Sequence, residues 1–184
     1  MEDMRILDLY WERSEDAVAQ TARKYGRYCY AIAYGILESE SDAEEIVNDT
    51  YLKVWNTIPP ERPAVLSSYV GMICRQLSIN RYHAQTAQKR GGGQVEEAEE
   101  ELAYCLPSYD PDPVEMLHMQ RVLNQFLRGL PKQSRVVFLR RYWYLNPVSQ
   151  IARDCSMTEG AVKMLLHRTR KKLKDFLRKE GIEI

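Results

Sequence analysis

Apolar residues recur at spacings of three and four along nearly the whole chain, and no run of residues alternates between apolar and polar. A spacing of three and four is typical of amphipathic helices, whereas alternation would indicate half-buried strands. Only residues 88–113 lack a helical pattern. The sequence therefore predicts an all-α fold, with two small helical bundles over residues 1–87 and 114–184 and a flexible linker between them.

Helix start and stop signals divide each bundle further. In the first bundle we expect helices over residues 14–37, 41–58 and 67–87, with Ser41 or Asp42 as the cap of the second. In the second bundle we expect helices over residues 114–128, 131–142, 147–154 and 158–179. The short break at 154–157 joins a short helix to a long basic one, which is typical of a helix-turn-helix.

The segment between the bundles is acidic and rich in glycine and proline. It contains Gly91, Gly92 and Gly93, then five glutamates between positions 96 and 101, then a cluster of Pro and Asp. Such a composition buries too little apolar surface to offset the entropy of ordering the chain, so we expect a flexible acidic linker. On the simplest interpretation, the acidic side chains of this linker only keep it solvated. The alternative is that it mimics nucleic-acid charge inside a basic channel of a partner.

The net charge of zero conceals a strong segregation of charge along the chain. Residues 67–90 carry four basic side chains and no acidic one, and residues 131–180 carry thirteen basic and four acidic ones. The remaining segments are acidic. Two basic islands in an acidic chain indicate a protein that contacts nucleic acid at two places, although solvated charged faces could produce the same pattern.

The sequence contains no membrane or secretion signal that we recognise. No stretch approaches the roughly 20 apolar residues that span a bilayer. The first nine residues already carry Glu2, Asp3, Arg5 and Asp8, so they lack the basic start and apolar run of a signal peptide. We therefore expect a cytoplasmic protein without membrane insertion.

Residues suited to metal binding or catalysis are scattered. The four cysteines form no CxxC pair, and the three histidines have no carboxylate or cysteine at catalytic or metal-ligand spacing. We predict reduced structural thiols, no metal site, no cofactor, no catalytic residue and no enzymatic activity.

The long basic helix predicted over 158–179 has two distinct faces. On a helical wheel, Val162, Leu166, Thr169 and Leu173 fall on one side and are assigned to the core. The opposite side carries the candidate base contacts, which suit the major groove: Lys163, Met164, His167, Arg168 and Lys171. Cations further along are candidate phosphate contacts: Arg170, Lys172, Lys174 and Arg178.

The second bundle resembles region 4 of the extracytoplasmic-function (ECF) sigma factors of the sigma-70 family. The matching segments are residues 130–139, 148–152, 159–163 and 168–173. The resemblance implies binding to the -35 promoter element, although response-regulator output domains share much of this pattern. Ser156 replaces the usual turn glycine, and Met164 and Leu165 depart from the common residues, so we expect a different DNA preference.

Residues 42–55 resemble region 2.2 of the same family, which docks on the clamp helices of RNA polymerase. A helical wheel turns one side of this helix inward: Ala43, Ile46, Val47, Thr50, Tyr51, Val54 and Ile58. The outward side carries the candidate polymerase-binding residues, among which Leu52 is the apolar anchor: Glu45, Asn48, Asp49, Leu52 and Lys53.

Residues 66–82 are similar to regions 2.3 and 2.4, which open and read the -10 element. Opening a duplex is offset by stacking on aromatic rings and by polar and cationic contacts to the strand. The candidate -10 contacts are Arg75, Ser78, Arg81, Tyr82, Lys89 and Arg90. On the wheel, Gln76 and Asn80 turn toward the apolar side, and we expect them to have structural roles as readily as functional ones.

The resemblance covers both bundles in order, so the sequence predicts a sigma factor that binds core RNA polymerase and directs initiation at specific promoters. It also implies promoter DNA and an anti-sigma factor as partners. The alternative is a helix-turn-helix regulator that acts alone, with the first bundle as a sensor or dimerisation domain. An enzyme is the least supported class.

Overall fold

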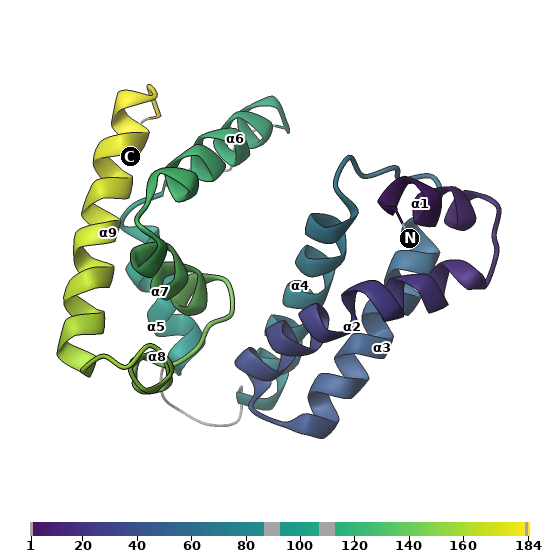
Figure 1. Ribbon diagram of the computed structural model, residues 1–184, viewed down its shortest axis with the longest axis horizontal. Helices are drawn as coiled ribbons and strands as arrows, with labels where there is room; N and C mark the ends of the chain where they lie inside the picture. Colours follow the sequence, from purple (N-terminus) through teal and green to yellow (C-terminus); the bar gives the residue numbers. More distant parts are fainter. Residues whose placement is uncertain (1, 87–92, 107–112, 183) are drawn as a thin grey trace. The chain divides into compact units, whose positions relative to one another are not determined.

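The computed structural model describes residues 2–86, 93–106, 113–182 and 184, and within these ranges it contains nine helices and no strand. The chain forms two compact units, Met1–Gly91 and Gly92–Ile184. Figure 1 shows the helices of both units. The prediction of an all-α fold is confirmed.

The first unit is a bundle in which α2 contacts each of the other helices. Its helices are α1 (Asp3–Trp11), α2 (Asp16–Leu37), α3 (Glu40–Thr57) and α4 (Leu66–Thr86). The core consists of fully buried side chains such as Ile32, Ile36, Val54 and Val70. Burial of this apolar stripe from each helix is the main force that holds the bundle together.

Helix α1 was not predicted, because its nine residues are too few to show a clear helical period. It nevertheless buries Ile6, Leu7 and Tyr10, and the Tyr10 hydroxyl hydrogen-bonds to Thr21 Oγ1 at 2.8 Å. The predicted N-cap of α3, Ser41 or Asp42, is also wrong. Ser39 caps α3 instead, since its Oγ accepts a hydrogen bond from the Asp42 backbone N–H at 3.3 Å.

The described part of the second unit contains five helices. They are α5 (Gln94–Ala103), α6 (Pro113–Gly129), α7 (Lys132–Tyr142), α8 (Val148–Asp154) and α9 (Glu159–Lys179). Helix α9 packs on α6, α7 and α8 and hydrogen-bonds to α5. Phe126 of α6 lies against Phe138 and Phe176, with ring centroids 6.3 Å and 5.6 Å away. These aromatic contacts hold α6 between α7 and α9.

The prediction of a flexible linker over 88–113 is wrong for residues 94–103, which form α5 and belong to the second unit. Val95 and Ala98 are buried, and Leu102 follows on the same side of the helix. Three apolar residues at spacings of three and four are enough to dock a helix. The five glutamates around them hid this narrow stripe. Residues 88–92 and 107–112 of the predicted linker lie outside the described residues.

The predicted helix-turn-helix is formed by α8, the turn 155–158 and α9. Ser156 adopts the left-handed conformation, with φ of 52°, and the Met157 N–H donates back to the Ala152 carbonyl at 2.8 Å. Thr158 caps α9 by accepting a hydrogen bond from the Ala161 N–H at 3.2 Å. The turn therefore ends one helix and starts the next within four residues.

A glycine at position 156 should relieve the strain of this turn. A side chain in the left-handed region costs roughly 1 to 2 kcal/mol, part of which is returned as unfolded-chain entropy when glycine replaces it. We expect Ser156→Gly to raise the free energy of unfolding of the second unit by about 0.5 kcal/mol. Urea unfolding measures the change. The control is Ser156→Ala, which keeps a Cβ and should not stabilise the unit, so equal gains from both changes would contradict this account.

Candidate functional site

The outer face of α9 is a set of exposed side chains next to the turn. Val162, Leu166, Thr169 and Leu173 are buried as predicted. The predicted outward side chains are all exposed, and we call them the α9 outer face: Lys163, Met164, His167, Arg168 and Lys171. The sequence pattern therefore located this surface correctly, because the helix buries a single apolar stripe.

The α3 outer face is the corresponding surface of the first unit. Its predicted members are all exposed: Glu45, Asn48, Asp49, Leu52 and Lys53. Leu52 is 60% exposed and lines an open hollow with Val18, Tyr51 and Trp55. An exposed leucine beside other apolar groups, among acidic neighbours, can anchor a partner helix.

Arg81, a predicted DNA contact, instead pairs with acidic residues of α3. Its guanidinium donates to both Glu45 carboxylate oxygens, at 3.0 and 2.6 Å, and to Asp42 at 3.1 Å. Hydrogen bonding and charge from Arg81 hold the pKa of Glu45 below its ordinary value. The structure therefore joins one candidate DNA residue and one candidate polymerase residue in a single ion pair between α3 and α4.

The expected DNA-facing side of α4 is wrong in part. Ser78 is fully buried and its hydroxyl donates to the Cys74 carbonyl at 2.8 Å, so it does not face outward. Gln76 and Asn80, expected to turn inward, are exposed and hydrogen-bond to each other at 2.9 Å. The wheel failed because α4 packs on both α2 and α3, and its polar residues leave the apolar side ambiguous.

The exposed stripe of α4 consists of side chains at spacings of three and four, which we call the α4 outer stripe: Met72, Gln76, Asn80 and His83. Arg75 and Tyr82 are partly exposed beside it. Lys89 and Arg90 lie outside the described residues. Sequence reasoning missed this stripe, and the signal that could have found it was the i, i+4 spacing of Met72, Gln76 and Asn80.

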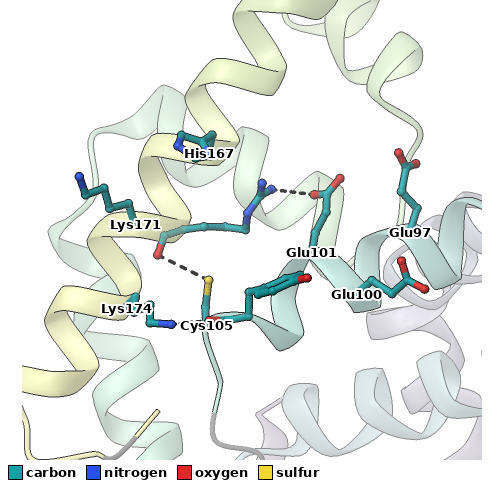
Figure 2. Close-up of a pocket in the computed structure, with 9 residues that line it drawn as sticks. Glu97, Glu100, Glu101, Cys105, His167, Lys171 and Lys174 are labelled. Carbon is teal, nitrogen blue, oxygen red and sulfur yellow. Dashed lines mark hydrogen bonds and ion pairs between the residues drawn. The ribbon is translucent and has the colours of Figure 1, made fainter.

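An open hollow of about 560 Å³ separates α5 from α9 in the second unit. Figure 2 shows glutamates of α5 on one side and basic residues of α9 on the other. The acidic side is formed by Glu97, Glu100 and Glu101, and the basic side by His167, Arg170, Lys171 and Lys174. Two members of the α9 outer face, His167 and Lys171, therefore line a hollow whose opposite wall is acidic.

Glu101 is the centre of a hydrogen-bonded network that joins α5, α7 and α9. Its carboxylate accepts from Arg141 at 3.0 Å, from the Tyr142 hydroxyl at 2.7 Å and from Arg170 at 2.8 Å. Arg141 is fully buried and also pairs with Glu97 at 2.9 Å. A buried guanidinium needs such partners, since an unpaired charge in the interior is very costly.

The charge state of Glu101 follows from these neighbours. Burial alone would raise its pKa, but the hydrogen bonds from Arg141 and Tyr142 and the nearby charges of Arg141 and Arg170 outweigh it. The pKa of Glu101 is therefore lowered, and the carboxylate is ionised at neutral pH. The network behaves as a fixed negative charge between two arginines.

Two of the predicted phosphate contacts are occupied within the protein. Arg170 is bound to Glu101 and to the Tyr142 hydroxyl, and the Lys174 ammonium donates to the Tyr104 carbonyl at 3.1 Å. The sequence could not show this, because the partners come from a segment that was expected to be a linker. The predicted phosphate contacts Lys172 and Arg178 are exposed.

Within the described ranges, no three His, Cys, Asp or Glu side chains gather closely enough to hold a metal ion, and no helix is long and apolar enough to cross a membrane. The four cysteines are free thiols, of which Cys29, Cys74 and Cys105 are buried.

These features define a class of protein: a two-unit helical protein with a helix-turn-helix whose second helix presents a basic face. Residues 21–88 match the family sigma-70 region 2, and residues 120–173 match the family sigma-70 region 4. The chain belongs to the sigma-70 family, in its ECF group, and carries regions 2 and 4. Helix α5 lies between the two matched ranges.

A relative in this family is the ECF RNA polymerase sigma factor SigE of Mycolicibacterium smegmatis. The two proteins are 23% identical over 167 residues, which is 89% of this chain and 63% of that protein. The chain therefore spans less than two thirds of the length of this relative.

Neutralising Glu101 should destabilise the second unit in a pH-dependent way. We expect Glu101→Gln to lower the free energy of unfolding by about 2 to 3 kcal/mol at pH 7, because buried Arg141 keeps only Glu97 as a charged partner and Arg170 loses its ion pair. The lowered pKa means that this stabilisation is complete above the unfolded-state value of 4.5 and is lost as the pH falls through the folded-state pKa. Urea unfolding between pH 3 and pH 7 measures the difference.

The control for this change is Glu99→Gln, which removes the same charge from an exposed position on the same helix. Surface substitutions of this kind usually change stability by less than about 0.5 kcal/mol. Equal losses in the two variants, or a loss that does not depend on pH, would contradict the role assigned to Glu101.

Proposed function

We propose that this protein is a dissociable sigma subunit of RNA polymerase. In the proposal the first unit docks on the core enzyme and opens the -10 element, and the second unit binds the -35 element. The observation that carries it is that regions 2 and 4 occur in order and each presents an exposed face of suitable chemistry. Because both DNA contacts are tethered to one enzyme, each can be weak individually.

The α3 outer face supports the polymerase contact. Leu52 stands 60% exposed above a hollow of about 640 Å³ that Trp55 and Val18 also line. Such a site suits an apolar side chain of a partner, and the surrounding Asp49 and Asn48 suit polar contacts at the rim. The relative from Mycolicibacterium smegmatis is named as an RNA polymerase sigma factor, which supports the same partner here.

The α4 outer stripe supports the -10 contact. Asn80 and Gln76 present amides that can hydrogen-bond base edges, while Met72 and His83 offer flat or flexible surfaces for unstacked bases. We propose these four residues as -10 contacts together with Arg75 and Tyr82. Arg81 is proposed to position α4 through Glu45, and Lys89 and Arg90 stay as proposed strand contacts.

The α9 outer face supports the -35 contact. Lys163 and Arg168 can donate to guanine edges in the major groove, and Met164 can contact a thymine methyl group. The left-handed turn at Ser156 and the Thr158 cap fix the angle between α8 and α9, as a helix-turn-helix requires.

The proposal brings a location and a further partner with it. RNA polymerase works in the cytoplasm, so we propose that this protein does too. The resemblance to ECF sigma factors supports an anti-sigma factor that covers the polymerase-binding or DNA-binding faces. No chemical step is proposed for the chain itself.

The test of this function is in vitro transcription with bacterial core polymerase on a library of genomic fragments from the source organism. We expect start sites that depend on the added protein and share motifs near -10 and -35. A protein that yields no dependent start site is not a sigma factor.

Truncation of Leu52 should weaken polymerase binding without changing DNA affinity. We expect Leu52→Ala to raise the Kd for core polymerase by roughly thirtyfold, the equivalent of about 2 kcal/mol for a central apolar anchor. The control is Met4→Ala, which removes an equally exposed apolar side chain from α1. If Leu52→Ala left polymerase binding and transcription intact, the result would favour the alternative, a regulator that acts alone.

Truncation of Asn80 should impair promoter opening rather than polymerase binding. We expect Asn80→Ala to lower the yield of open complex about fivefold, since one polar contact to an extruded base is worth about 1 kcal/mol. Permanganate reactivity of unpaired thymines measures the open complex. The Kd for core polymerase should stay unchanged, and a yield equal to wild type would remove Asn80 from the -10 contacts.

A further inference from the structure

Helix α5 lies against the basic flank of α9. It belongs to the second unit, it lies outside both matched family ranges, and its acidic residues face the basic helix that the proposed function assigns to the -35 element. The basic flank of α9, formed by His167, Arg170, Lys171 and Lys174, is the surface in question.

The contacts that hold α5 use cations that suit phosphate. The Glu101 carboxylate pairs with the Arg170 guanidinium at 2.8 Å, and the Tyr104 carbonyl accepts a hydrogen bond from the Lys174 ammonium at 3.1 Å. Arg170 is only 20% exposed in this arrangement, so its guanidinium is not available to an outside anion. Arginine and lysine at these positions of a DNA-facing helix would otherwise contact backbone phosphates.

The remaining charges on the flank oppose DNA as well. Glu97 is 65% exposed and Glu100 is exposed, and both line the same hollow as His167 and Lys171. A duplex whose backbone follows this flank brings phosphates near these carboxylates. At physiological salt, charges within about 8 Å of each other are not fully screened, so the glutamates repel the backbone.

We propose that the basic flank of α9 is a polyanion-binding surface that α5 occupies in the free chain and the DNA backbone takes over on promoter binding. The inference rests on the proposed function, since it assumes that α9 contacts duplex DNA. It goes further by naming α5 as an intramolecular competitor of that contact. Arg170 and Lys174 cannot contact Glu101 and the Tyr104 carbonyl while they contact phosphates.

Helix α5 is held by a narrow apolar stripe, which consists of Val95, Ala98 and Leu102, and by the ion pairs of Glu97 and Glu101. Among these contacts, the pair of Glu101 with Arg170 is the one that joins α5 to the basic flank of α9. Any partner that binds α5, or any gain of phosphate contacts, therefore shifts the balance toward the DNA-competent form. Free protein is expected to bind duplex weakly for this reason.

The test measures duplex DNA binding by the full chain, with fluorescence anisotropy on a labelled duplex across a range of salt concentrations. The variants are Glu101→Gln, which removes the central contact, and Glu100→Gln, which removes a charge from the wall of the hollow but no hydrogen bond of the Glu101 network. Glu99→Gln is the matched control, because it removes the same charge from the same helix outside the hollow. Circular dichroism checks that each variant keeps its helix content.

We expect Glu101→Gln to tighten duplex binding by about tenfold, because the competent fraction rises. Glu100→Gln should tighten it by about threefold, because one carboxylate that repels the backbone is removed. The plot of log K against log salt should steepen by about 1 to 2 in Glu101→Gln, since each released cation adds roughly 0.9. Glu99→Gln should match wild type. Equal changes in Glu99→Gln and Glu100→Gln, or unchanged binding in Glu101→Gln, would overturn the inference.

A double-mutant cycle separates this inference from the proposed function. Arg170→Gln should lower duplex affinity strongly in the Glu101→Gln background and hardly at all in wild type, where Glu101 already holds Arg170. Lys163→Ala, on the α9 outer face, should lower affinity in both backgrounds. If Lys163→Ala has no effect, the proposed -35 contact fails. If Lys163→Ala weakens binding but the cycle shows no coupling, only the competition fails.

Discussion

The pairing of buried Arg141 with Glu101 is the constraint on which the second unit depends. Arg141 is fully enclosed, and its charge must be balanced where α5, α7 and α9 meet. Glu101 supplies that balance and, through the same carboxylate, fixes Arg170 of α9. One of the nitrogens, Arg141 Nε, has no hydrogen-bond partner among the described residues, so the network is already under-satisfied. Loss of Glu101 therefore removes contacts among α5, α7 and α9.

The same carboxylate links stability with the proposed function. In the proposed function α9 packs on α7 and α8 and presents one face to DNA, and α5 contributes to that packing. It does so by holding Arg170 and Lys174, which are proposed phosphate contacts. A contact that stabilises the free chain thus opposes its proposed ligand, which is a common way to keep binding weak until a partner shifts the balance. In the first unit, the Arg81 pair with Glu45 joins α3 and α4 in a simpler way.

Most of the fold and two of the three candidate surfaces were predictable. The outer faces of α3 and α9 follow from the helical period, since each of these helices buries one clear apolar stripe. The face of α4 was predicted wrongly because polar Ser78 is buried, its hydroxyl being satisfied by the Cys74 carbonyl of its own helix. Polarity alone does not distinguish a side chain that faces solvent from one that bonds to the backbone behind it.

Local periodicity, turn chemistry and residue spacing were enough to predict the helical class, seven of the nine described helices, the helix-turn-helix and the resemblance to the sigma-70 family. The formation of α1 and α5, and the docking of acidic α5 beside the basic helix, depend on tertiary contacts. Both helices have weak local signals and gain their stability from side chains distant in sequence, such as Thr21 for Tyr10 and Arg141 for Glu101. A periodic pattern along the sequence does not reveal a pair such as Glu101 and Arg141, which lie 40 residues apart.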